Sequence, residues 1–339
     1  MKIEVSSPSN IALVKYWGKH GQQLPLNPSV SFTLSAAQSI TEIDWQEADA
    51  FGFQFSFEGQ AKPAFEPKLQ AFFERIAHLA PELKQVQLRI NSRNTFPHSS
   101  GIASSASAFS ALAIGIAEGL RHLRHEEGIN IHLASEMARL GSGSACRSVF
   151  PQAAFWGAHA GVPASTDLAA IGVADQLHPV FKSYRDTILL VDEGVKSVSS
   201  TAGHALMNGH VFGAARIDQA FAHSLQMLHI LEQGNLEAFV HMVELEALTL
   251  HALMMSADQP YLLMRPGTVG IIEEVRRFRH ETGEPVAFTL DAGANVHLLF
   301  PEQAEQRVNN WVEEVLSAYC GKRYLCDRVG DGPTWKSSV

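Results

Sequence analysis

The sequence has few cysteines, and none of them forms a recognisable pair. Cys146, Cys320 and Cys326 are the three cysteines among 339 residues, and no CxxC spacing occurs. An odd count without such a pair argues against a disulfide framework and against a zinc site built from thiolates. Reduced, partly buried thiols are the simpler interpretation.

The sequence also lacks a metal-binding histidine pattern. There are 16 histidines, but HExxH does not occur. His122 and His125 have no neighbouring set of ligands at metal spacing, and neither do His204 and His210. We therefore predict no metal site built from protein ligands.

Long apolar runs and an excess of positive charge are missing as well. No run of about 18 apolar residues occurs, and the opening MKIEVSSPSN contains no signal-peptide core. These absences predict no membrane association and a cytoplasmic location. The formal net charge of −9 disfavours a nucleic-acid partner. A negative chain that handles anionic substrates must gather its lysines and arginines locally.

The composition is globular, with 46% hydrophobic and 18% charged residues. Alternating or short apolar runs predict strands over 11–16, 29–34, 41–45, 51–57, 86–91, 155–157, 186–192, 286–290 and 296–300. Helical periodicity predicts helices over 67–79, 132–140, 268–280 and 302–318, over most of 200–255, and after a polar loop within 94–120. The character changes near residue 190, so we expect an α+β fold of two packed halves, 1–188 and 189–339, with a cleft between them.

The segment PHSSGIASSAS, residues 97–107, is rich in small residues and runs directly into the apolar helix. Its backbone N–H groups and the helix N-terminus together suit a phosphate. Neither GxxxxGK[ST] nor GxGxxG is present. A serine-rich cap of a buried helix would give the same local pattern.

The same segment resembles the phosphate loop of the GHMP kinases, PxxxG[LI]xSSA. The matching positions are Pro97, Gly101, Ile102, Ser104, Ser105 and Ala106. The resemblance implies the GHMP kinase fold: a ribosomal S5-like N-terminal domain with the ATP phosphate loop, and a ferredoxin-like C-terminal domain.

Three further segments resemble the mevalonate diphosphate decarboxylases within that superfamily. They are SNIALVKYWGK at 9–19, RLGSGSACRSVF at 139–150 and FTLDAGANVHLLF at 288–300; VKSVSSTAG at 195–203 also matches a family segment. Taken singly, each segment has a simpler interpretation. Residues 9–19 fit an edge strand with solvated lysines, 139–150 a turn with a surface arginine, and 288–300 an Asx-type turn. The resemblance extends from about residue 6 to about residue 333, and four motifs occur in the family's order.

The resemblance implies a role for each matching residue. Asp291 would orient or deprotonate the 3-hydroxyl, Lys15 would keep Asp291 ionised, and Arg147 would grip the substrate carboxylate. The residues implied to contact substrate phosphates are Tyr16, Lys19, Ser144, Ser200 and Thr201. Those implied to bind the nucleotide are Pro97, Ser99, Ser100, Gly101, Ile102, Ala103, Ser104, Ser105, Ser107 and Lys196.

The implied activity is ATP-dependent decarboxylation of mevalonate 5-diphosphate to isopentenyl diphosphate, with ATP and Mg²⁺ as cofactors and a homodimer as the assembly. Three alternatives stay open. They are a decarboxylase of the 5-monophosphate, a 3-kinase that does not decarboxylate, and a catalytically silent ligand sensor. Retention of Lys15, Arg147 and Asp291 disfavours the last two.

Overall fold

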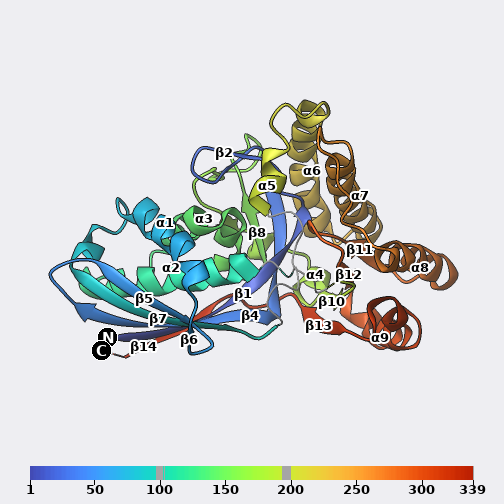
Figure 1. Ribbon diagram of the computed structural model, residues 1–339. Coiled ribbons are helices and arrows are strands. Elements are labelled where there is room, and N and C mark those ends of the chain that lie inside the picture. The colour runs from blue at the N-terminus through green and yellow to red at the C-terminus, as the bar shows by residue number, and fades with distance from the viewer. Residues whose placement is uncertain (97–101, 103, 193–199, 339) are drawn as a thin grey trace.

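The computed structural model describes residues 1–96, 102, 104–192 and 200–338, of which residues 200–202 are described as backbone only. Its strands form two large sheets and one two-stranded sheet, and helices pack against the two large sheets (Figure 1). An α+β fold was predicted, and the similarity to solved structures given below confirms it.

The first sheet has eight strands, six of them in the order β14-β1-β4-β7-β5-β6; β8 pairs with β4, and β9 with β8. Its strands are β1 (Lys2–Val14), β4 (Ser29–Glu47), β5 (Gly52–Phe57), β6 (Gln60–Ala61), β7 (Val86–Asn94), β8 (Ala153–Trp156), β9 (Ile171–Gly172) and β14 (Thr334–Ser338). All the pairs are antiparallel except β5 with β7. A small hairpin joins β2 (Lys19–His20) to β3 (Leu24–Pro25).

The two longest strands, β1 and β4, form the centre of this sheet. Where the sequence predicted two separate strands, at 29–34 and 41–45, the structure has one continuous strand, Ser29–Glu47. The pairing of β1 with β4 shifts register between Pro8 and Asn10. Residues 35–40, between the two predicted strands, do not alternate in polarity. A register shift of this kind lets a single strand continue through such residues.

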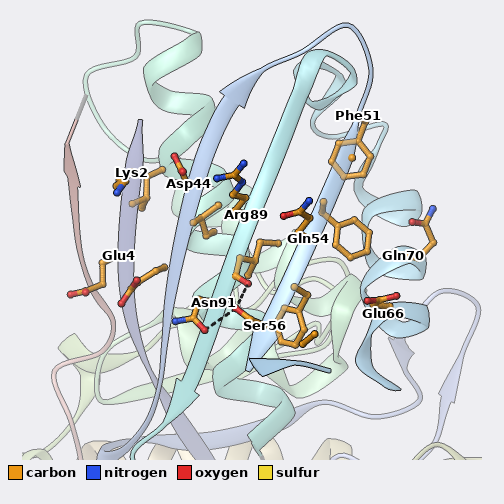
Figure 2. Close-up of a pocket in the computed structure, with 18 of the residues that line it drawn as sticks. Lys2, Glu4, Asp44, Phe51, Gln54, Ser56, Glu66, Gln70, Arg89 and Asn91 are labelled. Carbon is orange, nitrogen blue, oxygen red and sulfur yellow. Dashed lines mark hydrogen bonds between the residues drawn. The ribbon is translucent and has the colours of Figure 1, made fainter. Parts of the chain in front are cut away.

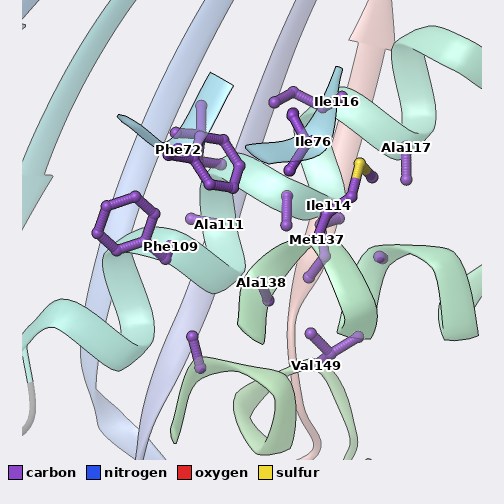
Figure 3. Packing of buried hydrophobic residues seen from close by; sticks show 14 of the residues in the cluster. Phe72, Ile76, Phe109, Ala111, Ile114, Ile116, Ala117, Met137, Ala138 and Val149 are labelled. Atoms are coloured by element: carbon purple, nitrogen blue, oxygen red, sulfur yellow. The ribbon is translucent and has the colours of Figure 1, made fainter. Parts of the chain in front are cut away.

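Three helices cover one face of the first sheet: α1 (Glu66–Ile76), α2 (Ser104–Leu123) and α3 (Ile131–Gly141). Figure 3 shows the core that they share, in which Phe72 of α1, Phe109 of α2 and Met137 of α3 are buried. Helix α2 approaches the sheet closely at Gly119, where an added Cβ would lie 2.2 Å from Trp45.

The second sheet has the order β11-β12-β10-β13 and is antiparallel. Its strands are β10 (Arg185–Leu189), β11 (Ala287–Thr289), β12 (Val296–Phe300) and β13 (Tyr324–Arg328). Helices α8 (Pro266–Thr282) and α9 (Glu305–Glu314) share its core, where Phe278 stacks on Trp311 with ring centroids 4.1 Å apart. The helix expected over 302–318 is divided between α9 and 3₁₀ turns on either side of it.

Two long helices, α6 (Gly213–Gln233) and α7 (Leu236–Met255), pack against β1 and so lie where the two halves meet. Short helices α4 (Pro179–Lys182) and α5 (Ser200–Ala205) precede them. Helix α7 is the one described helix long and apolar enough to cross a membrane by length and composition. Of that stretch, 61% is buried inside the protein, and a core helix passes the same test.

The two halves share a continuous core, and the second half also contributes a strand to the first sheet. One hydrophobic cluster contains Leu13 of β1, Phe32 of β4, Ile188 of β10 and Phe239 of α7. Strand β14, at the C-terminal end, pairs with β1 in the first sheet. The division of the chain after residue 188 stays a prediction.

A hollow of about 1410 Å³ opens along the first sheet (Figure 2). Strands β1, β4, β5 and β7 line it, together with the start of α1. Its side chains mix both charges, as Lys2, Glu4, Asp44 and Arg89 illustrate. None of the predicted catalytic or binding residues lines this hollow, so the candidate site lies elsewhere.

Candidate active site

A buried lysine and a carboxylate meet where the two halves of the chain come together. Lys15 directly follows β1 and is only 1% exposed. Its Nζ lies 2.9 Å from Oδ1 of Asp291, which follows β11 in the second half. The Asp291 side chain is 32% exposed, so the pair is buried on the lysine side and accessible on the carboxylate side. A partly exposed carboxylate is therefore paired with a lysine that is shielded from solvent.

The backbone of Lys15 is also fixed. Its N–H donates to Oε2 of Glu246 at 2.9 Å, and its carbonyl accepts from Arg216 at 3.1 Å and from Asn27 at 3.0 Å. Arg216 and Glu246 form a fully buried, bidentate ion pair, with distances of 2.7 and 2.6 Å. Burial alone would raise the pKa of Glu246, but hydrogen bonds from His223 and Arg216 lower it to about 2.

Arg147 is a buried guanidinium held by neutral groups. It is 2% exposed; its Nη1 donates to Oγ of Ser29 at 2.7 Å, and its Nη2 donates to Oδ1 of Asn10 at 3.1 Å. Its Nε has no hydrogen-bond partner within the described structure. Burial lowers the pKa of Arg147, while the charge of Asp291 opposes that shift. Among the described residues no carboxylate forms an ion pair with Arg147, so an anionic ligand would supply the missing counter-charge.

Tyr16 lies in an aromatic wall beside the lysine. Its ring centroid is 4.8 Å from that of Trp156 and 4.4 Å from that of His204. The Tyr16 hydroxyl is buried without a partner in the described part of the chain, and burial raises its pKa. An added Cβ at Gly143 would lie 2.8 Å from this hydroxyl, so only glycine lets the backbone come this close to it.

The cations Lys19, Lys68 and Arg75 interact electrostatically, and the sequence analysis recognised only Lys19. Burial lowers the pKa of Lys19, and the charge of Arg75 lowers it further. Burial also lowers the pKa of Lys68, with the charges of Lys19 and Arg75 adding to the effect. No ion pair links any of the three to a carboxylate within the described ranges. Lys68 and Arg75 lie on α1, whose sequence indicated only an amphipathic helix.

The start of α2 lies beside these cations. A cavity of about 180 Å³ is lined by Lys68, Ser104 and Ser105, among others. The hydroxyl of Ser105 lies 3.0 Å from that of Ser142, the residue before the 3₁₀ turn that carries Arg147. Polar hydroxyls, a lysine and the N-terminal end of a long helix suit an anion.

The structure places some predicted ligands and is silent on others. Ser144 donates no hydrogen bond that we see in the described part, but its carbonyl accepts from Asn10 at 3.0 Å. Ile102 and Ser107 are buried, and the Ser107 hydroxyl lies 2.7 Å from that of Ser39 in the interior. Six predicted residues lie outside the described residues, and two more are described as backbone only. The six are Pro97, Ser99, Ser100, Gly101, Ala103 and Lys196; the two are Ser200 and Thr201.

Within the described ranges, no group of three or more His, Cys, Asp or Glu side chains is placed to hold a metal ion. Cys146 and Cys320 are buried and Cys326 is exposed, all as free thiols.

Comparisons with known proteins agree on one family. Residues 7–168 match the model of the diphosphomevalonate decarboxylase-like N-terminal domain, and residues 187–333 match that of the mevalonate 5-diphosphate decarboxylase C-terminal domain. The diphosphomevalonate decarboxylase of Bos taurus is 30% identical over 86% of this chain and 75% of its own length. The diphosphomevalonate decarboxylase of Candida albicans is 29% identical over 90% of this chain and 85% of its own length.

Solved structures resemble the whole fold. One, described as "MDDEF in complex with MVAPP, AMPPCP and Magnesium", is 26% identical, covers 100% of this chain and 99% of its own, and superposes with a TM-score of 0.84. The chain therefore belongs to the diphosphomevalonate decarboxylase family.

Proposed function

We propose that this protein decarboxylates mevalonate 5-diphosphate at the expense of ATP, giving isopentenyl diphosphate, ADP, phosphate and CO₂. Family membership supports the reaction, as does the family's place in the mevalonate pathway. The observation that carries the proposal at the level of atoms is the 2.9 Å contact of buried Lys15 with Asp291, beside a buried Arg147 that lacks a carboxylate partner among the described residues.

Asp291 and Lys15 act on the tertiary hydroxyl of the substrate. The Asp291 carboxylate accepts the hydroxyl proton as the oxygen attacks the terminal phosphoryl group. The Lys15 ammonium stabilises that carboxylate and offsets negative charge on the transferring group. Phosphorylation turns a poor leaving group into phosphate. When phosphate leaves with its bonding electrons, the carboxylate–carbon bond breaks, CO₂ departs, and the electrons of that bond form the new double bond.

Arg147 binds the substrate carboxylate until CO₂ leaves. Two of its nitrogens already donate to Ser29 and Asn10, which fix the plane of the guanidinium and leave Nε free within the described structure. The phosphate groups of the substrate contact Tyr16, Lys19, Ser144, Ser200 and Thr201. Lys68 and Arg75 add positive charge next to Lys19.

The nucleotide binds at the start of α2. The site comprises Pro97, Ser99, Ser100, Gly101, Ile102, Ala103, Ser104, Ser105, Ser107 and Lys196. Support comes from the cavity beside Ser104, Ser105 and Lys68 and from the relative that holds AMPPCP, an ATP analogue, with magnesium. When bound with ATP, Mg²⁺ neutralises charge on the phosphate oxygens.

We expect a cytoplasmic homodimer that binds neither nucleic acid nor membrane. The net charge of −9 supports the expectation on nucleic acid. Size-exclusion chromatography with light scattering tests the dimer.

The reaction is tested by supplying the protein with ATP, Mg²⁺ and mevalonate 5-diphosphate, and by following ADP, phosphate and CO₂ together. We expect the three products in equal amounts. ADP without CO₂ would make the protein a kinase, and no product at all would favour the silent sensor.

A parallel assay with the 5-monophosphate addresses the second candidate. The Lys19, Lys68 and Arg75 cluster favours the diphosphate, because three cations without a carboxylate partner in the described chain match a larger negative charge. Turnover of the monophosphate alone would reassign the substrate.

A further inference from the structure

One buried helix contacts both members of the Lys15–Asp291 pair. Helix α7 carries Glu246, whose Oε2 accepts from the Lys15 N–H at 2.9 Å, and His251, whose Nε2 lies 3.1 Å from the Asp291 carbonyl oxygen. Glu246 is 0% and His251 is 1% exposed. Neither side chain reaches the accessible side of the site, so their contacts are to the backbone of the pair and not to a ligand.

The Glu246 contact belongs to a rigid ionic group. Arg216 of α6 grips both Glu246 oxygens and also donates to the Lys15 carbonyl at 3.1 Å. The His223 ring nitrogen lies 2.6 Å from Glu246 Oε1. Both polar atoms of the Lys15 backbone are therefore held from the two helices, which fixes where its side chain starts.

The His251 contact has a defined direction. The Asp291 carbonyl can only accept, so Nε2 of His251 carries the hydrogen. Burial lowers the pKa of His251 to about 4, so the ring is neutral at physiological pH and adds no charge beside Lys15.

We propose that Glu246 and His251 are positioning residues, and that helix α7 sets the separation of Lys15 from Asp291 through them. The two backbone segments come from opposite halves of the chain, and α7 packs against the strand that precedes each of them, β1 and β11. The two contacts lie on one helix, at positions 246 and 251, so their spacing cannot change without unwinding it. The inference rests on the roles proposed above for Lys15 and Asp291.

The first test compares two substitutions at one position. His251→Gln retains an N–H donor for the Asp291 carbonyl, whereas His251→Leu retains bulk but no donor. We expect kcat to fall about 10- to 100-fold in the leucine variant, with KM for both substrates nearly unchanged, and to recover in the glutamine variant. Equal losses in both variants, or full activity in the leucine variant, would overturn the proposal.

The second test uses a matched control on the same helix. Glu244 pairs with Arg279 at 2.6 Å as Glu246 pairs with Arg216, but it does not touch the Lys15 backbone. Glu244→Gln and Glu246→Gln each remove one buried or half-buried charge partner, and both should lower Tm. Only Glu246→Gln should lower kcat at a temperature where both variants are folded. An equal effect on kcat would reduce Glu246 to a structural role.

A crystal structure of His251→Leu separates the failure of this inference from failure of the proposed function. We expect the Lys15 Nζ to Asp291 Oδ1 distance to increase beyond hydrogen-bond range. That outcome would support positioning even if the wild type released no CO₂. An unchanged distance would overturn the inference even if the wild type were fully active.

Discussion

At the scale of single residues, the site combines a lysine shielded from solvent with a carboxylate that solvent reaches. The Lys15 side chain is 2% exposed and that of Asp291 is 32% exposed, although their charged atoms lie 2.9 Å apart. The ion pair is thus oriented by the protein before any substrate binds, which lowers the reorganisation needed in the transition state.

Asp291→Asn should lower kcat by about 10²- to 10⁴-fold, because the amide cannot take up the hydroxyl proton. Binding of a fluorescent ATP analogue should change little, since we assign Asp291 to the substrate hydroxyl and the nucleotide to the start of α2. Steady-state assays and a binding titration measure the two effects. Asp49→Asn, at an exposed position, is the control. Normal turnover by the Asp291 variant would exclude Asp291 as the base.

Arg147→Lys should lower kcat/KM by roughly 10- to 100-fold, although the charge is kept. A single ammonium cannot replace the guanidinium bonds to Ser29 and Asn10 while also binding a carboxylate, and a hydrogen bond to a charged group contributes about 1.5–3 kcal/mol. Arg277→Lys, on an exposed side chain, should leave kinetics unchanged. Equal kinetics for both variants would argue against carboxylate binding by Arg147.

Sequence reasoning found the lysine and the aspartate but not the reason they meet. The two are 276 positions apart, and no local pattern links them; the family resemblance alone did. Lys68 and Arg75 were missed because a surface helix ordinarily carries such residues. One signal was available. Neither Lys68 nor Arg75 has an Asp or Glu three or four positions away, where a helix would place a partner.

At the scale of elements, the packing of α2 on the first sheet depends on small residues. Gly119 lets the helix approach Trp45, as the 2.2 Å distance from an added Cβ indicates. Periodicity predicted the helix correctly, but it could not show which face would need glycine. The close approach of the α2 backbone to Trp45 is set by tertiary packing, and a single sequence does not show which residues pack together.

Gly119→Ala should lower the free energy of unfolding by about 1–3 kcal/mol, because Trp45 must move within a close-packed core. Gly128→Ala is the matched control: nothing lies within 4 Å of an added Cβ there, so stability should be unchanged or slightly higher. Urea unfolding followed by tryptophan fluorescence measures both variants. A Gly119 variant as stable as the control would mean that the core yields more easily than we infer.

The strands were predicted less completely than the helices. Neither β13 nor β14 was predicted. Strand β13 contains Cys326 and Asp327, and every position of β14 is exposed, so neither shows a clear alternation of apolar and polar residues. Edge strands of this kind alternate weakly. Their partners, β10 and β1, lie far away in the sequence and supply the pairing that local propensity does not.

At the scale of the whole molecule, stability should depend on pH through buried neutral histidines. Burial lowers the pKa of His251 to about 4 and that of His204 to about 3, whereas an unfolded chain binds protons at about pH 6.5. Between these values, unfolding takes up protons, so the free energy of unfolding falls as pH falls. His251 alone accounts for up to about 3 kcal/mol of this loss.

Below about pH 5, Glu246 adds to the effect. Its folded-state pKa of about 2 means that its stabilising contribution is present above the unfolded value and disappears as pH falls toward 2. Urea unfolding at pH 7, 6, 5 and 4 checks the histidine contribution, and His251→Gln should flatten the curve. A free energy of unfolding that stayed constant over this range would contradict the prediction.

The pairing of β14 with β1 also has a consequence during synthesis. Strand β1 is synthesised before the other described strands, whereas β14, which pairs with one of its edges, is synthesised after them. An open strand edge is a template for pairing with other chains. The edge of β1 that β14 covers therefore stays open in the nascent chain until residues 334–338 have been synthesised, and during that interval it can pair with other chains.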